Sequence, residues 1–295
     1  PPRSTLFPYT TLFRSMNTHV VYTPLYGDEV PFMKDPLYDP ADWLPAVKPL
    51  YDHYGYKGIV EDLIERSQNN HNPDYYRALY DGAVRTVDRH IQDLVSVLQR
   101  KKIFDNTVLI ITSDHGEMLG EHELYFHHGW YLYEQLIKVP LIVKPAGAVQ
   151  ARVVTQQVAA HLDIAPTIMA CVRRRPYSWM RGEDLLSGLT KAKNDGRVFS
   201  DEGFLVRSVR TGSWKLIWYR EDTLPYRYEM FDMQADPQET ADVQGRYPEV
   251  FSALRRSLAK FIEEADSSSK PVMDPLYMNI DEDAKERLRS LGYMH

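Results

Sequence analysis

The chain has 295 residues, of which 43% are hydrophobic and 26% are charged. This length and composition are those of a globular protein with one large domain or two modest ones. The formal net charge of -6 excludes a general attraction to nucleic acid or anionic lipid, so an anionic substrate needs a local positive cluster or a metal ion. The single cysteine, Cys171, excludes an internal disulfide framework and a thiolate zinc cluster. No apolar run reaches the roughly 18 residues that span a bilayer.

The first 75 residues lack a regular apolar period. Residues 1–15 repeat the triplet Thr-Leu-Phe and have no features of a signal peptide, so we interpret them as a non-native leader. The natural N-terminus is then expected to be absent, which leaves periplasmic, secreted and cytoplasmic locations open. Residues 16–75 are rich in Pro, Tyr, Asp and Asn and predict a long, irregular covering segment.

The middle of the chain alternates helical and strand patterns. Apolar residues at helical spacing predict a helix from residue 75 to about residue 100. Strands are expected at VLIIT (108–112) and PLIV (140–143), and further helices at 131–138 and 161–172. This alternation is typical of a parallel α/β sheet.

Beyond residue 195 the pattern changes to a period of two, which predicts a small antiparallel sheet. A helix is expected at about 248–264, followed by a linker and a short helix in the tail. We therefore expect an α/β domain over 16–194, an antiparallel subdomain with a packing helix over 195–270, and a tail over 271–295.

Asp114 and His115 come directly after the predicted strand at 108–112. Ligands bind at the carboxyl edge of open α/β sheets, and Gly116 lets the backbone turn sharply there. A carboxylate and an imidazole in one crevice form half of a metal site. The alternative is that Asp114 caps a following helix and His115 is an ordinary surface histidine.

Further histidines follow within fourteen residues. His127 and His128 can be cationic near neutral pH and could bind an oxyanion, although a polar loop would contain them equally well. His122, in the same stretch, could bind an oxyanion or belong to a polar loop. His19 lies far N-terminal to this stretch and could be an ordinary turn residue. Three nearby acids are interpreted as solvated loop or first-turn residues: Glu117, Glu121 and Glu123.

Several stretches in this order resemble the sulfatase family of the alkaline-phosphatase superfamily. They are DNTVLIITSDHGEMLGEH (105–122), LYEQLIKVPLI (132–142), HLDIAPTIM (161–169), RTGSWKLI (210–217), MFDMQADPQET (230–240) and ERLRSLGY (286–293). The resemblance implies part of an alkaline-phosphatase-like α/β/α sandwich, followed by a small C-terminal antiparallel sheet subdomain.

The resemblance also implies roles for individual residues. Asp114 and His115 match a pair of ligands for a divalent metal, usually calcium. His19 matches a sulfate-contacting histidine in H-x-P-Y-x-P, although this chain has Val21 in place of the first proline. His128 stands near a sulfate-binding lysine or histidine, and its neighbour His127 is the alternative.

Two features of the family do not appear in this sequence. Family members carry an N-terminal pair of acidic metal ligands and a C-x-P-x-R or S-x-P-x-R segment whose first residue becomes formylglycine, the nucleophile. Cys171, in CVRRRP, has Arg173 where a proline belongs and follows the S-D-H-G stretch, so we interpret it as a small apolar residue at a helix end. The chain is expected to be the C-terminal portion of a sulfatase, with formylglycine in the missing part.

The implied function is metal-assisted hydrolysis of a sulfate ester on a sulfated small molecule or glycan, with this fragment inactive. Two alternatives remain. One is a phosphoryl or phosphonate ester hydrolase of the same superfamily, and the other is a non-catalytic binding protein with the same fold. The nucleotide sequence upstream of Met16 would separate them.

Overall fold

A computed structural model describes Thr18, Tyr22 and the ranges 72–147, 159–187, 196–203, 205–220 and 228–267, together with Ala151 and Val153. The described residues fall into two compact units that divide between Tyr247 and Pro248. The predicted leader and the predicted tail helix lie outside these ranges. Within them, no helix is both long and apolar enough to cross a membrane.

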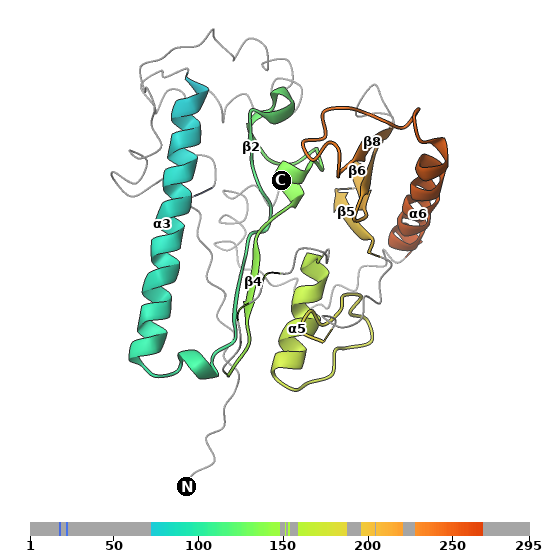
Figure 1. The fold of residues 1–295 in the computed structure, drawn as a ribbon. Helices are drawn as coiled ribbons and strands as arrows, with labels where there is room; N and C mark the ends of the chain where they lie inside the picture. The colour runs from blue at the N-terminus through green and yellow to red at the C-terminus, as the bar shows by residue number, and fades with distance from the viewer. Residues whose placement is uncertain are drawn as a thin grey trace, which may run out of the picture. The chain divides into compact units, whose positions relative to one another are not determined.

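The first described helix, α3 (Pro73–Arg100), confirms the helix that the apolar spacing predicts. Asn72 caps it by accepting a hydrogen bond from the Asp74 backbone N–H at 3.0 Å. Proline at the first helical position fits because its missing N–H has no partner there in any helix. The helix leads through η2 (Phe104–Asn106) into strand β1 (Figure 1).

Strands β1 (Leu109–Thr112) and β4 (Leu141–Lys144) pair with each other in antiparallel register. The prediction of a parallel arrangement is therefore wrong for this pair. Between the two strands the chain forms a hairpin, β2 (Met118–Leu119) with β3 (Tyr125–His127), and the short helix α4 (Glu134–Ile137). A four-residue helix spans about 6 Å and cannot return the chain along a strand of about 13 Å, as a parallel crossover requires.

The helical region predicted at 161–172 is confirmed as η4 (His161–Asp163) followed by α5 (Ile164–Cys171). The carboxylate of Asp163 accepts hydrogen bonds from the backbone N–H groups of Ala160 at 2.8 Å and Glu183 at 2.7 Å. Thr167 donates to the Asp163 carbonyl at 2.6 Å and accepts from Leu185 N–H at 3.0 Å. The HLDIAPT stretch therefore ties the segment after α5 back onto the helix.

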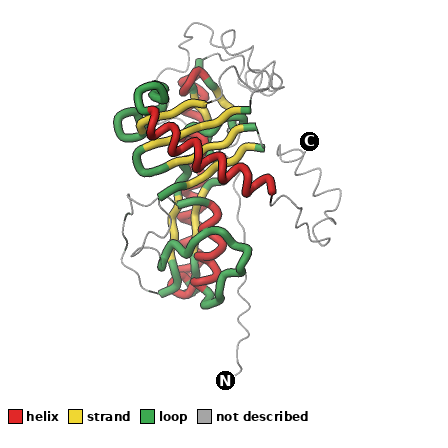
Figure 2. Tube along the Cα trace, turned by 90° about the vertical axis from the view of Figure 1, so that its right-hand side faces the viewer, coloured by secondary structure: helices red, strands yellow, loops and turns green. Residues whose placement is uncertain are grey.

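The predicted antiparallel sheet is confirmed as a four-stranded meander in chain order (Figure 2). Its strands are β5 (Val198–Glu202), β6 (Val206–Arg210), β7 (Trp214–Tyr219) and β8 (Tyr228–Asp232). The predicted helix near 248–264 is also confirmed, as α6 (Pro248–Ser267) in the second unit.

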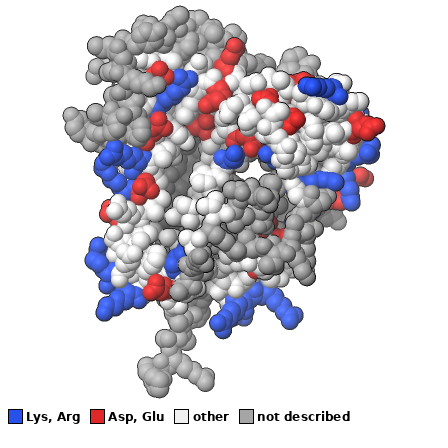
Figure 3. Space-filling model, in the orientation of Figure 1, with Lys and Arg blue, Asp and Glu red and all other residues white. Residues whose placement is uncertain are grey.

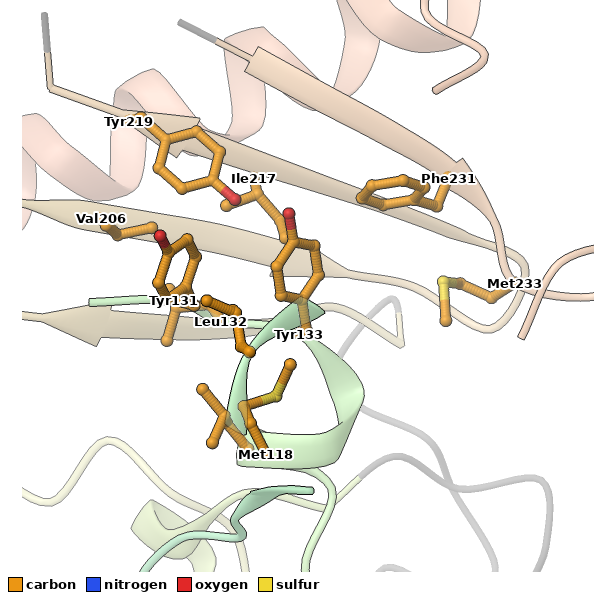
Figure 4. Close-up of a cluster of buried hydrophobic side chains, with 11 residues drawn as sticks. Met118, Tyr131, Leu132, Tyr133, Val206, Ile217, Tyr219, Phe231 and Met233 are labelled. Atoms are coloured by element: carbon orange, nitrogen blue, oxygen red, sulfur yellow. The ribbon is translucent and has the colours of Figure 1, made fainter. Parts of the chain in front are cut away.

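The main core lies between one face of this sheet and the segment that enters α4. The rings of Tyr131 and Tyr133 point toward the sheet, where Val206 and Ile217 lie, whereas Leu132 lies on the side of Met118 (Figure 4). Phe231, also on the sheet, has its ring 6.2 Å from that of Tyr133. The same cluster contains Met118, Leu124, Leu136, Val206, Tyr219 and Met233. Burial of this apolar face fixes the S-D-H-G region and α4 against the sheet.

A group of charged residues, which we call the buried ion cluster, lies beside this core. Lys215 is fully buried, with Nζ 2.6 Å from Glu239 Oε1 and 3.3 Å from Glu134 Oε1. Glu239 also accepts the Glu134 backbone N–H at 2.6 Å, and Arg210 lies 3.4 Å from Glu134 Oε1. Burial raises the pKa of Glu239, and the charge of Lys215 opposes this shift. The cluster joins the LYE, WKLI and DPQE stretches of the chain.

Candidate functional site

The S-D-H-G turn at the end of β1 is held by hydrogen bonds on several sides. Ser113 Oγ donates to the His115 carbonyl at 2.6 Å, and the His115 backbone N–H donates to Asp114 Oδ1 at 3.1 Å. Gly116 N–H donates to the Leu136 carbonyl at 2.7 Å, which joins the turn to α4. The next regular element after the turn is a strand, so Asp114 does not cap a helix.

Gly116 is required by this close approach to α4. A Cβ atom at this position would lie 1.9 Å from the carbonyl oxygen of Gln135, closer than real Cβ contacts allow. The contacting atom is backbone, so it cannot swing aside as a flexible side chain would. The sequence analysis assigned this glycine to a sharp backbone turn, whereas the structure shows that close packing against α4 requires it and that its φ lies outside the left-handed region.

The side chains of His115 and Asp114 are partly exposed and lie side by side, with two possible metal-ligand atoms near each other. His115 Nδ1 lies 2.8 Å from the Gly116 carbonyl, which can only accept a hydrogen bond. Nδ1 therefore carries the hydrogen, and in the neutral ring Nε2 keeps its lone pair. Nε2 lies 3.9 Å from Asp114 Oδ1, and the two side chains are 34% and 51% exposed. A divalent ion about 2.0–2.4 Å from each donor fits between these atoms.

His128 lies against this pair. Its ring stacks on that of His115, with centroids 4.4 Å apart and planes inclined by 19°. Its Nδ1 is 3.3 Å from Glu117 Oε1. The prediction that Glu117 is a solvated acid is wrong, because its side chain is only 3% exposed.

The surroundings of His128 favour its cationic form. Burial lowers the pKa of His128, but the hydrogen bond that its Nδ1 donates to Glu117 and the negative charges of Glu117, Asp114 and Glu202 outweigh burial, so the pKa is raised. An imidazolium beside a metal position is suited to contact an anionic oxygen.

Two contacts at the site could not be read from the sequence. His161 Nε2 lies 2.8 Å from the Ser113 carbonyl, so this histidine of the HLDIAPTIM stretch steadies the turn from 48 residues away. Tyr22 has its ring 5.4 Å from that of Tyr80 and 6.1 Å from that of Phe126. The tyrosine of H-x-x-Y-x-P is therefore packed against α3 and β3.

The side chains of two predicted site residues, His19 and His127, are not among the described parts of the structure. His19 lies outside the described residues. The backbone of His127 is in β3 opposite Met118, but its side chain is not described. Of the predicted set, the structure brings Asp114, His115 and His128 together.

His122 belongs to the core side of the hairpin. Its ring stacks on Tyr133 at 3.8 Å with planes inclined by 6°. Burial lowers the pKa of His122, which the charge of Glu121 only partly offsets. Its Nε2 is buried and has no hydrogen-bond partner in the described part of the chain. This histidine is therefore separate from the donor pair.

Cys171 is the last residue of α5, as the sequence predicts. Burial and the charge of Asp184 raise the pKa of its thiol, which disfavours the nucleophilic thiolate. Across the described ranges, no cluster of three or more His, Cys, Asp or Glu side chains could hold a metal. Asp114 and His115 therefore form a pair without a third ligand of this kind among the described residues.

Comparison with known proteins identifies the family. A model of the sulfatase family matches residues 12–173, and a model described as N-sulphoglucosamine sulphohydrolase, C-terminal, matches residues 120–264. The chain belongs to the sulfatase family. It is 28% identical over 215 residues to an N-acetylglucosamine-6-O-sulfatase of Bacteroides thetaiotaomicron, covering 66% of this chain and 36% of that relative. The chain thus spans about a third of the length of this curated relative.

Solved structures with low sequence identity share the fold. A 2-O GAG sulfatase matches with a TM-score of 0.59 and 22% identity, covering 72% of this chain and 49% of that one. The phosphonate monoester hydrolase of Agrobacterium radiobacter matches with a TM-score of 0.54 and 18% identity, covering 66% and 42%. These likenesses support the alkaline-phosphatase-like fold, mixed α/β with a small antiparallel sheet.

Proposed function

We propose that this chain supplies metal-binding and anion-binding residues to an enzyme that hydrolyses sulfate esters. The observation that carries the proposal is the partly exposed pair of Asp114 and His115, 3.9 Å apart, with the ring of His128 stacked on that of His115. This arrangement combines a place for a cation with a hydrogen-bond donor for an anion. Membership of the sulfatase family supports sulfate as that anion.

Asp114 and His115 would hold a divalent ion, with calcium expected from the family resemblance, and its charge would stabilise negative oxygens of the ester. His128 would donate a hydrogen bond to a sulfate oxygen or assist the departing alkoxide, while Glu117 holds its ring in place. His19, and His127 as the alternative to His128, are further candidates for sulfate contact. The family resemblance assigns the nucleophile to a formylglycine, which the residues described above do not supply.

The substrate class we propose is a sulfated small molecule or glycan. Similarity to an N-acetylglucosamine-6-O-sulfatase supports a sulfated sugar. Two donors give a weak site, so calcium affinity for this chain is expected in the range of about 10⁻⁴–10⁻³ M, near that of weak extracellular calcium modules. Calorimetric titration measures it, and tight stoichiometric binding would contradict a two-donor site.

The second candidate is a phosphonate or phosphoryl ester hydrolase, which the fold of the Agrobacterium radiobacter enzyme favours. Binding of 4-nitrophenyl sulfate and of a 4-nitrophenyl phosphonate monoester to the full chain, with and without calcium, compares the two. We expect calcium-dependent binding of the sulfate ester that Asp114→Asn and His128→Ala both abolish. Preference for the phosphonate supports the second candidate, and calcium-independent binding of either ester contradicts both.

A non-catalytic binding protein would give the same binding but no hydrolysis. The test is turnover of 4-nitrophenyl sulfate by the product of the complete natural gene. Calcium-dependent turnover that is lost in His115→Ala supports the enzyme. Binding without turnover in that protein supports the non-catalytic alternative.

A further inference from the structure

The segment that follows α5 exposes arginines and aromatic rings side by side. We call Arg173, Arg174, Arg175, Tyr177 and Trp179 the Arg-Trp platform. All five residues are exposed, and the exposed fractions of Tyr177 and Trp179 are 59% and 71%. Exposed apolar surface that is contiguous and rimmed by polar residues is a feature of interaction sites.

The backbone holds the platform in a defined shape. Arg173 adopts a left-handed conformation with φ of 57°, which ends α5, and Arg174 N–H donates to the Met169 carbonyl at 2.8 Å. A turn closes the aromatic part, where Met180 N–H donates to the Tyr177 carbonyl at 3.0 Å. The rings of Tyr177 and Trp179 stack with centroids 5.7 Å apart and planes inclined by 6°. The two rings therefore lie parallel and against each other at the exposed surface.

Among the described residues, no acidic side chain pairs with the arginines of the platform. The structure gives no ion pair and no side-chain hydrogen bond to Arg173, Arg174 or Arg175 within the described residues. Figure 3 shows Lys and Arg side chains gathered at the lower end of this face, below α5. In a chain with a formal charge of -6, three adjacent exposed guanidinium groups form a local site for a polyanion.

We infer that the Arg-Trp platform binds a sulfated polysaccharide outside the candidate catalytic site. Guanidinium groups bind oxyanions through paired N–H donors, and flat aromatic faces pack against the apolar faces of sugar rings. α5 separates the platform from the His161 end of the helical region by about 12 Å, since eight residues rise 1.5 Å each. The choice of a sulfated glycan over another polyanion rests on the proposed function.

Binding of the full 295-residue chain to dextran sulfate, with unsulfated dextran as reference, tests this inference. The variant Arg173→Ala/Arg174→Ala/Arg175→Ala should weaken binding about tenfold, since it removes three exposed ion pairs between the guanidinium groups and the sulfate groups of the polymer. Trp179→Ala should weaken the binding of dextran sulfate but leave the salt dependence of that binding unchanged, because the variant removes a ring that contacts the sugar and removes no charge. The matched control is Arg100→Ala/Lys101→Ala/Lys102→Ala, which removes the same charge from the exposed end of α3.

Selective loss in the platform variants supports the inference, and equal loss in both triple variants contradicts it because it indicates a general charge effect. Tighter binding to single-stranded oligothymidylate or to phosphatidylserine vesicles than to dextran sulfate also contradicts it. His115→Ala/His128→Ala should abolish calcium-dependent binding of 4-nitrophenyl sulfate, whereas the platform triple variant should retain it. Failure of the platform and failure of the candidate catalytic site are therefore measured separately.

Discussion

The S-D-H-G turn and the buried ion cluster are two charged regions that use their charges differently. In the turn, Asp114 and His115 keep accessible donor atoms. In the cluster, Lys215 is fully buried and its charge is matched by Glu134 and Glu239. Both regions come from stretches that resemble the family. The contrast shows that such stretches leave charged side chains partly exposed in the turn and pair them inside the protein in the cluster.

The two regions are nevertheless linked through α4. Gly116 N–H donates to the Leu136 carbonyl, and Glu134 at the start of α4 joins the ion cluster. The cluster therefore fixes the short helix against which the turn is built. Changes in the cluster should lower the stability of the protein, whereas changes in the open donors should alter binding.

The largest effect is expected from Lys215→Met. This change leaves Glu134 and Glu239 without their buried cation, and should lower the free energy of unfolding by about 3–5 kcal/mol. Urea denaturation measures the loss. Lys101→Met, at an exposed position, is the control and should change stability by less than about 0.5 kcal/mol. The double variant Lys215→Met/Glu239→Gln should recover part of the loss, and a loss below about 1 kcal/mol in the single variant would contradict a structural role.

Gly116→Ala should have the next largest effect, because the added Cβ meets the Gln135 carbonyl. We expect a loss of about 1–3 kcal/mol and weaker calcium binding, since the turn must move away from α4. Gly212→Ala is the matched control, as a Cβ there meets nothing within 4 Å. Wild-type calcium affinity in Gly116→Ala would show that the contact with α4 does not position the donors.

His122 should destabilise the fold as the pH falls. Its folded pKa is lowered, so the unfolded chain binds the proton more readily and stability drops below the usual imidazole pKa of about 6.5. His122→Phe keeps a ring against Tyr133 and removes the titration. The measurement is the unfolding free energy between pH 5 and pH 8, where the variant should lose less stability than the wild type on the acidic side.

His128 should show the opposite dependence with a smaller effect. Its folded pKa is raised, so its pairing with Glu117 contributes stability below the unfolded pKa that is lost as the pH rises through the folded pKa. The difference in stability between wild type and His128→Gln should therefore shrink toward alkaline pH. A difference in stability that grows with pH would contradict a raised folded pKa of His128.

The sequence predicted those features that depend on local periodicity or on a motif. Helical spacing located α3, alternation located the four-stranded sheet, and the end of an apolar run located Asp114 and His115. The burial of Lys215 also had a signal, because a period of two places Lys215, Ile217 and Tyr219 on the same face of β7. That face is the one packed on the core.

Other features depend on contacts that no local pattern records. The antiparallel pairing of β1 with β4 follows from the shortness of α4, which only the folded chain shows. Glu117 is buried because His128, eleven residues away, pairs with it. His161 reaches Ser113 across 48 residues. Long-range contacts of this kind escaped the analysis of the sequence.

The most direct test of the proposed metal site is a calcium titration followed by NMR of the histidine rings at constant pH. We predict that the His115 ring signals shift with weak affinity, that those of His128 follow because the rings are stacked, and that Asp114→Asn abolishes both changes with stability preserved within about 0.5 kcal/mol. Unchanged His115 signals in the wild type, or the same shifts in Asp114→Asn, would contradict a cation held between Asp114 and His115.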